Sequence, residues 1–237
     1  MNNYVILTVA RSGKSWIAET LYWLGLGYGL EILTEFARKM APGQARLSTA
    51  YEREGMAGLA RTFIEVDSEE GYPCTGVTLQ WTNLSMIEVA NRTSELKAFI
   101  EALQPCVTFY LRRRDILAQA ISHFIMMKSG YYHSTDFEGR RRQRVNVCYD
   151  RAEIASYLDF TQRSYNSWDA LLAESNITPI PLYYEDFVAD PLVNFKDLAK
   201  CISGRSYSND TIAAAASCQS KVSDSIDEAF RARYLAE

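Results

Sequence analysis

The sequence has few of the features that mark secreted or membrane-spanning proteins. Its five cysteines are scattered over 237 residues, form no C-x-x-C pair, and cannot all pair internally because their number is odd. No signal peptide is recognisable, so we expect reduced thiols and a cytoplasmic location. The longest apolar stretch, around Thr20 to Leu30, is interrupted by glycines and is shorter than the ~20 residues that cross a bilayer. We therefore expect no transmembrane segment.

The sequence also lacks an excess of positive charge and a recognisable metal-binding pattern. Its 25 lysines and arginines against 29 acidic residues give a net charge of -4. Nucleic acids and anionic membranes need a summed positive field, so neither is expected as a partner. Neither an H-x-x-x-H nor a C-x-x-C pair is present, so no metal is expected. Any anion site in this chain must therefore be local.

No internal repeat, low-complexity tract or Pro/Ser-rich linker divides the chain, so we expect one domain over residues 1–237. Short apolar or β-branched segments at 4–9, 74–79, 106–111 and 179–184 are predicted strands. Helical stretches separate them, including one after residue 154 whose apolar stripe contains Tyr165 and Trp168, which we expect in the core. This alternation predicts an α/β fold in which helices flank a parallel β-sheet.

The junction between the first predicted strand and its helix carries the strongest functional signal. The turn Arg11-Ser12-Gly13-Lys14-Ser15 is small, basic and rich in hydroxyls. A helix start presents backbone N–H groups and a partial positive charge, glycine allows a ligand to approach closely, and two cations add full charges. The turn predicts a phosphorylated ligand or cofactor. An ordinary strand-to-helix turn with two surface cations is the simpler alternative.

The order of residues in this turn distinguishes two kinds of phosphate loop. Gly13-Lys14-Ser15 fits the end of the nucleotide P-loop, G-x-x-x-x-G-K-[ST], but Thr8 stands in place of the first glycine. Read as basic-Ser-Gly-x-[ST]-Trp, residues 11–16 resemble the loop with which sulfotransferases hold the 5′-phosphosulfate of 3′-phosphoadenylyl sulfate (PAPS). The resemblance implies that residues 11–15 hold this end of the cofactor, with Lys14 or Arg11 offsetting charge on the leaving oxygen.

A second polar segment follows the strand at 106–111. If a helix starts at Asp115, then Asp115, Gln119 and Ser122 share one face, opposite an apolar stripe. Ligands of open α/β sheets bind at the carboxyl ends of the strands, so this segment and the Arg11 turn are expected to face the same crevice. The polar face beside Arg113 is thus predicted to be available to a ligand.

Residues 111–122 resemble the L-R-R-x-D-x-x-x-Q-A-x-S segment of the bacterial carbohydrate sulfotransferase family typified by trehalose 2-sulfotransferase. This resemblance implies a PAPS-dependent enzyme with the P-loop-like sulfotransferase fold. Arg113 and Ser122 match the positions that hold the 3′-phosphate, and Arg112 and Arg114 are then ion-paired or solvated neighbours. Further similarity covers residues 183–191 (Y-E-D-x-x-x-D-P) and the basic tail, where Lys221 stands for a cofactor-binding arginine.

The resemblance also suggests a catalytic base. Glu35, followed by an aromatic residue, matches the family's Glu-aromatic pair, with Glu31 as the second choice and His123 and His133 as the remaining candidates. The proline of that motif is absent here, so a non-catalytic anion-binding module is one alternative. A small-molecule kinase using ATP and magnesium is another, suggested by Gly13-Lys14-Ser15.

The function expected from these features is transfer of a sulfuryl group from PAPS to a hydroxyl of a carbohydrate, glycolipid or other small molecule. The second product would be 3′,5′-adenosine bisphosphate. The resemblance also admits a homodimer, since several relatives form dimers, but no stripe in the sequence defines an interface.

Overall fold

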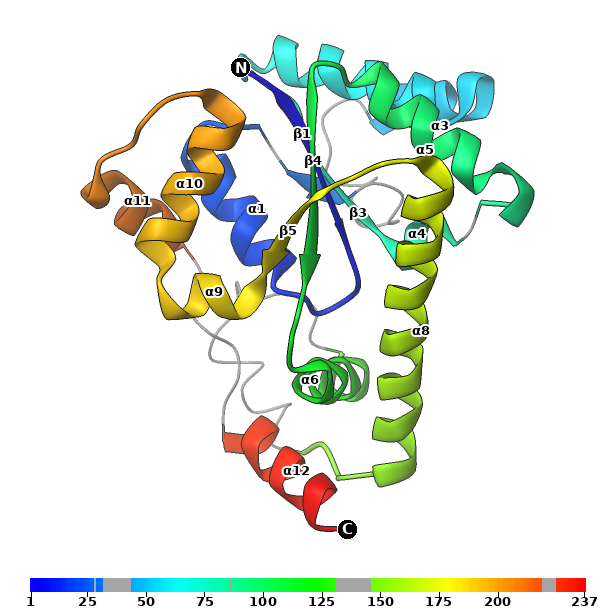
Figure 1. The fold of residues 1–237 in the computed structure, drawn as a ribbon, viewed down its shortest axis with the longest axis vertical. Helices are drawn as coiled ribbons and strands as arrows, with labels where there is room; N and C mark the ends of the chain where they lie inside the picture. Colours follow the sequence, from blue (N-terminus) through cyan, green and yellow to red (C-terminus); the bar gives the residue numbers. More distant parts are fainter. Residues whose placement is uncertain (28, 32–43, 86, 131–145, 219–224) are drawn as a thin grey trace.

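The computed structural model describes residues 1–27, 29–31, 44–85, 87–130, 146–218 and 225–237. Within them, five parallel strands form one sheet in the order β2-β3-β1-β4-β5 (Figure 1). The strands are β1 (Asn3–Thr8), β2 (Leu30–Glu31), β3 (Gly76–Gln80), β4 (Cys106–Arg112) and β5 (Ile180–Tyr183). The predicted α/β fold is confirmed, and each of the four predicted strands is found within two residues of its expected bounds. The two-residue strand β2 was not predicted.

Helices cover both faces of the sheet because successive β1 side chains point to opposite sides. Val5 and Leu7 pack with α3 (Gln44–Glu69), α5 (Arg92–Ala102) and α8 (Arg151–Ser175), whereas Tyr4 and Ile6 pack with α1 (Lys14–Trp23), α10 (Pro191–Ser203) and α11 (Asn209–Ala216). The two helical layers lie on opposite sides of the strands in Figure 1. The other described helices are α4 (Trp81–Leu84), the 3-10 helix η1 (Val89–Asn91), α6 (Ile116–Ser129), α9 (Tyr184–Ala189) and α12 (Ser225–Ala236).

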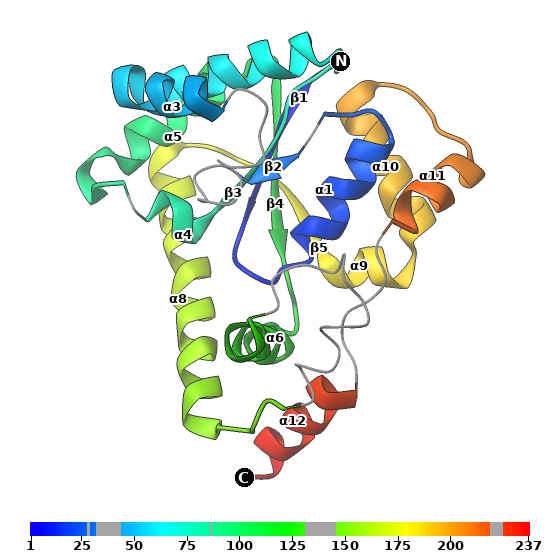
Figure 2. The ribbon, with the colours of Figure 1, turned by 180° about the vertical axis from the view of Figure 1, so that it is seen from behind.

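A third, smaller cluster lies beyond the carboxyl ends of β1 and β4, where α6, the start of α8 and α12 pack together (Figures 1 and 2). Its core contains Ile121, Phe124 and Ile154, with Phe230 packed against them. This cluster holds α6 across the edge of the sheet from which the Arg11 turn leaves β1. Among the described residues, no helix combines the length and apolar composition needed to cross a membrane.

Candidate functional site

The turn after β1 has an unusual backbone. Arg11 and Gly13 both adopt left-handed conformations, with φ of 63° and 92°, and Gly13 is the N-cap residue directly before α1. Within the described residues, no side chain caps that helix start. A Cβ at Gly13 would overlap the ring of Tyr184, so only glycine fits beneath this ring. The loop therefore presents the start of α1 without a bulky side chain at its tightest point.

Thr8 explains why the loop departs from a nucleotide P-loop. Its Oγ1 lies 2.5 Å from Ser12 Oγ and 3.2 Å from the carbonyl oxygen of Leu111, and both hydroxyl-bearing residues are fully buried. A glycine at this position could not bridge the loop and β4. The Ser12 hydroxyl consequently binds within the protein, so Ser12 can meet a ligand through its backbone N–H rather than its side chain.

The two predicted anchor segments lie together. Arg11 Nε donates to Ser122 Oγ at 3.2 Å, and Arg113 Nη1 donates to the carbonyl oxygen of Arg11 at 3.3 Å. Thr8 and Leu111 are register partners in the parallel ladder, so the loop after β1 and the segment after β4 leave the same edge of the sheet. This is the arrangement expected from the carboxyl-end rule for α/β sheets.

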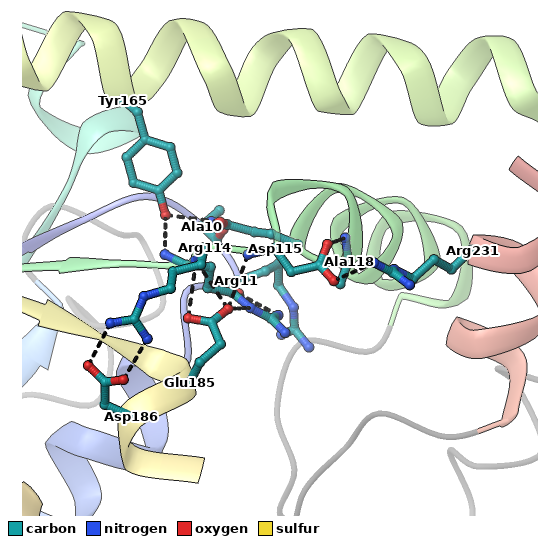
Figure 3. A network of polar contacts seen from close by, with 11 residues as sticks. Ala10, Arg11, Arg114, Asp115, Ala118, Tyr165, Glu185, Asp186 and Arg231 are labelled. Atoms are coloured by element: carbon teal, nitrogen blue, oxygen red, sulfur yellow. Dashed lines mark hydrogen bonds and ion pairs between the residues drawn. The ribbon is translucent and has the colours of Figure 1, made fainter. Parts of the chain in front are cut away.

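The three consecutive arginines have different environments. Arg112 is paired with Asp169 at 3.0 Å. Arg114 makes two hydrogen bonds, of 2.5 and 2.9 Å, to Asp186, and Figure 3 shows both of them. Arg113 is 16% exposed and lies 3.9 Å from Glu185 Oε1, beyond hydrogen-bond range. Its guanidinium stacks on Tyr184 at 4.4 Å, and within the described residues its Nε has no hydrogen-bond partner. Arg113 is therefore the member of this trio suited to an added anion.

Lys14 lies in the first turn of α1, beside half-buried Ser15. Burial, together with the positive charge of Arg11, lowers the pKa of Lys14 to about 7. Two cations that depress each other's charged forms are stabilised when an anion comes between them. The electrostatics of the loop thus favour an anionic ligand.

The predicted ligand-facing surface of α6 is smaller than expected. Asp115 caps the helix by accepting a 2.9 Å hydrogen bond from Ala118 N, and it pairs with Arg231 of α12 at 3.1 Å (Figure 3). Gln119 is fully buried and donates through Nε2 to the carbonyl oxygen of Ala10 at 2.7 Å. For Gln119, the prediction that its side chain is available to a ligand was wrong, because helical periodicity gives a shared face without telling what covers it. The side chain of Asp115 remains 35% exposed. Ser122 contacts the Arg11 side chain, whereas Gln119 contacts only the backbone of the same loop, at Ala10.

Sequence reasoning missed the polar roles of Tyr165 and Trp168. Both are buried in α8, as predicted, but Trp168 Nε1 donates to the carbonyl oxygen of Thr8 at 2.8 Å. Tyr165 donates through its hydroxyl to Gln119 Oε1 at 2.9 Å and accepts from Arg113 N at 3.1 Å. The available signal was chemical: a buried Tyr or Trp needs a partner for its polar tip.

Glu185 was also missed as a site residue. Its carboxylate accepts hydrogen bonds from the backbone N–H groups of Arg114, at 3.1 Å, and Asp115, at 3.2 Å (Figure 3). Glu185 therefore joins α9 to the segment in which Arg113 lies. The sequence did show the Y-E-D run after the last strand. That run alone does not indicate which groups the glutamate contacts.

His123 has the environment of a packed core residue. Its ring lies 4.7 Å from that of Tyr157 and 5.8 Å from that of Phe160, on the side of α6 that faces α8. Burial and the charge of Arg11 lower the pKa of His123 to about 4, and within the described residues its Nδ1 has no hydrogen-bond partner. These surroundings argue against His123 as the catalytic base.

Four further residues were predicted for the base and for the C-terminal contact with the cofactor. The backbone of Glu31 belongs to β2, opposite Thr78 of β3. Three predicted residues lie outside the described residues: Glu35, His133 and Lys221.

The family comparison agrees with this geometry. A family model described as Stf0 sulphotransferase matches residues 3–237, which include both anchor segments and the C-terminal helix. No curated protein matches the chain. The match favours sulfuryl transfer over the kinase alternative suggested by Gly13-Lys14-Ser15. The chain belongs to the Stf0 sulphotransferase family and is an enzyme that transfers sulfate.

Proposed function

We propose that this sulfotransferase takes its sulfuryl group from PAPS and transfers it to a hydroxyl of a carbohydrate, a glycolipid or another small molecule. The observation that carries the proposal is the 3.2 Å hydrogen bond from Arg11 Nε to Ser122 Oγ. It joins a loop suited to a 5′-phosphosulfate to a helix suited to a 3′-phosphate. PAPS carries both groups on one adenosine, so its two charged ends match the two adjoining segments.

The charges around the two segments support this donor. On the 5′ side, the backbone at the start of α1 offers N–H groups, and Arg11 and Lys14 supply positive charge. On the 3′ side, Arg113 has no carboxylate within hydrogen-bond range, and Ser122 adds a hydroxyl. When bound, PAPS would supply the sulfuryl group. Lys14 and Arg11 would then oppose the charge that grows on the phosphate as the group leaves.

The acceptor hydroxyl needs a base to take its proton. We assign this role to Glu35, with Glu31 as the second choice, and we assign Lys221 to the donor site, all three on the resemblance to the family. The backbone of Glu31 lies in β2, which pairs with β3 in the same sheet. Replacing Glu35 with alanine should abolish transfer while leaving affinity for 3′,5′-adenosine bisphosphate unchanged. Unchanged transfer would move the role to Glu31, which the matched variant Glu31→Ala tests.

The donor can be tested before the acceptor is known. Thermal unfolding should be followed with 3′,5′-adenosine bisphosphate in EDTA and, separately, with ATP and magnesium. A ligand that binds only the folded protein raises the unfolding temperature. Stabilisation by the bisphosphate without magnesium is the expected result, and stabilisation by Mg-ATP alone would overturn the proposed donor.

The acceptor can then be found by transfer. The protein is incubated with sulfur-labelled PAPS and a fractionated cell extract, and the labelled products are identified. We expect label in a hydroxyl-bearing carbohydrate, glycolipid or small metabolite. Labelling confined to proteins would contradict the proposed acceptor class while leaving the donor in place.

A further inference from the structure

A chain of buried hydrogen bonds connects helix α8 to both anchor segments. It runs from the Arg113 backbone N–H to the Tyr165 hydroxyl at 3.1 Å, and from that hydroxyl to Gln119 Oε1 at 2.9 Å. Gln119 Nε2 continues it to the carbonyl oxygen of Ala10 at 2.7 Å. Figure 3 shows Tyr165 reaching from α8 toward this junction. One end of the chain is therefore the Arg113 segment, and the other is the loop of Arg11.

The direction of every hydrogen bond in this chain is fixed by chemistry. Ala10 offers a carbonyl oxygen, so the amide nitrogen of Gln119 must face it and the amide oxygen must face Tyr165. The Tyr165 hydroxyl then gives its one proton to Gln119 and accepts from Arg113. Burial raises the pKa of Tyr165, so this proton is retained at neutral pH. The chain has one consistent arrangement.

Burial makes the arrangement hard to deform. Gln119, Tyr165 and Trp168 are each fully inaccessible to solvent. A buried polar group that loses its partner cannot turn to water, so each member holds the next in place. Trp168, one helical turn from Tyr165, donates to the carbonyl oxygen of Thr8, the last residue of β1 before the loop. Helix α8 is thus bonded directly to the end of β1 and, through Gln119, to the loop itself.

We propose that Tyr165 and Gln119 are positioning residues that set the separation between the two phosphate anchors. Neither is placed to touch a ligand, because both are buried behind the loop and the Arg113 segment. Their effect is exerted through Ala10 on one side and the Arg113 backbone on the other. This inference rests on the proposed PAPS donor, whose two charged ends lie at a fixed spacing.

The inference makes a selective prediction. A ligand with one phosphate needs one anchor and can adjust to a shift in the other, whereas a bisphosphate needs both at the right distance. Tyr165→Phe should therefore weaken binding of 3′,5′-adenosine bisphosphate about tenfold. Binding of adenosine 5′-phosphate and adenosine 3′-phosphate should each change by less than about threefold.

The matched control is Tyr110→Phe. Tyr110 is buried in the same cluster and its ring, which the variant keeps, lies 5.0 Å from the Arg112 guanidinium. Its hydroxyl donates to the backbone carbonyl of Tyr165 at 3.4 Å, not to the Arg113 backbone or to the Arg11 loop. It should change affinity for all three nucleotides by less than about twofold. Gln119→Met fills the same space without hydrogen bonds and should repeat the selective loss if Tyr165→Phe does not fold. Equal losses for all three nucleotides in the folded variant would overturn the inference.

Hydrogen exchange provides a readout that does not depend on the donor. Tyr165→Phe removes the acceptor of the Arg113 amide, so exchange at that amide should accelerate at least about tenfold, with no such change in Tyr110→Phe. Unaltered exchange in Tyr165→Phe would contradict the positioning role. If the wild-type protein fails to bind the bisphosphate while exchange responds as expected, the donor is wrong and the link between the two segments stands.

Discussion

Ionisable groups are buried both where the parallel strands end, at the carboxyl edge of the sheet, and where they begin, at its amino edge. The consequences of burial differ between these two places. At the carboxyl edge, burial and then the neighbouring charge of Arg11 lower the pKa of Lys14 to about 7. At the amino edge, burial raises the pKa of Asp67 in α3 to about 6, partly offset by hydrogen bonds from Thr75 and Gly76. Each edge therefore disfavours the charged form of one of its residues.

The difference lies in what could relieve that cost. Arg11, Lys14 and Arg113 are cations at the edge where ligands of α/β sheets bind, so an incoming anion stabilises all three. The groups that act on Asp67 are Thr75, Gly76 and Glu70, none of them a cation. Within the described residues, Asp67 Oδ2 has no hydrogen-bond partner. Burial at the carboxyl edge thus fits the proposed binding site, whereas burial at the amino edge costs stability.

The largest expected effect tests the shape of the carboxyl edge. Gly13→Ala places a methyl group against the Tyr184 ring, and the ring or the loop must move. We expect the rate of sulfate transfer to fall at least about 100-fold, because in the proposed site the loop holds the reacting end of the donor. Steady-state kinetics with saturating acceptor measure this loss.

Gly25→Ala is the matched control for Gly13→Ala. Gly25 also has a positive φ, of 72°, but a Cβ there meets no described atom within 4 Å. Both variants therefore share the backbone cost of about 1 kcal/mol in the free energy of unfolding, and they differ in the contact with Tyr184. Equal losses of activity in the two variants would show that strain, rather than the fit beneath the ring, sets the role of Gly13.

The next prediction compares neighbouring arginines at the same edge. Arg113→Ala removes a mostly buried cation whose ion pair with Glu185 is long, at 3.9 Å, whereas Arg114→Ala removes an exposed member of a close ion pair with Asp186. Affinity for 3′,5′-adenosine bisphosphate, measured by calorimetry, should fall about 10- to 100-fold in Arg113→Ala. It should change by less than about twofold in Arg114→Ala. A reversed order would place the 3′-phosphate elsewhere.

The fold and the meeting of the two anchors could be predicted from sequence because both follow from local patterns and one topological rule. Apolar runs bounded by turn formers gave four strands, and their parallel order brought Arg11 and Arg113 to one edge. Strand β2 has only two residues, so it is too short to show the residue pattern from which strands are predicted. Arg112 and Arg114 are ion-paired, which is one of the two alternatives that the sequence left open.

The inner support of the site could not be predicted, because its partners are remote in sequence. Trp168 and Thr8 are 160 positions apart, and Gln119 and Ala10 are 109 apart. Periodicity placed Trp168 and Tyr165 on a buried stripe but could not name what their polar tips would meet. For Gln119 the same reasoning gave the wrong answer, since a polar face can be covered by backbone carbonyls as well as by a ligand.

A pH titration of binding sharpens the electrostatic half of the comparison. A bound anion favours protonated Lys14, so the pKa of Lys14 is higher in the complex than in the free protein, where it is about 7. At a pH above 7, binding therefore takes up a proton. Affinity for 3′,5′-adenosine bisphosphate should fall as pH rises from 7, by about tenfold per unit at most. The phosphates themselves are already fully charged there, with a second pKa near about 6.

Lys14→Arg is the control for this titration. Arginine stays protonated throughout the range, so the fall in affinity above neutral pH should disappear. The loss of affinity at low pH, where the phosphates take up protons, should persist. Calorimetry in two buffers of different ionisation enthalpy would count the proton taken up. A wild-type profile that is flat from about pH 7 to pH 9 would remove Lys14 from the donor site.

The smallest effect concerns the amino edge and should appear in stability, not activity. The pKa of Asp67 is higher in the folded than in the unfolded protein, so its contribution to stability is full below about pH 4 and is lost as pH rises through about 6. Asp67→Asn keeps the shape and removes the buried charge, so at pH 7 it should raise the free energy of unfolding by about 1–3 kcal/mol. Urea unfolding of the variant and of the wild type at several pH values measures this difference in free energy, in which the contributions of the other titrating groups cancel.

The gain in the free energy of unfolding should vanish toward pH 4. Affinity for the bisphosphate should stay unchanged, because Asp67 lies at the opposite edge of the sheet from the proposed donor site. A gain independent of pH would mean that packing rather than charge limits the amino edge, and the contrast between the two edges would fail.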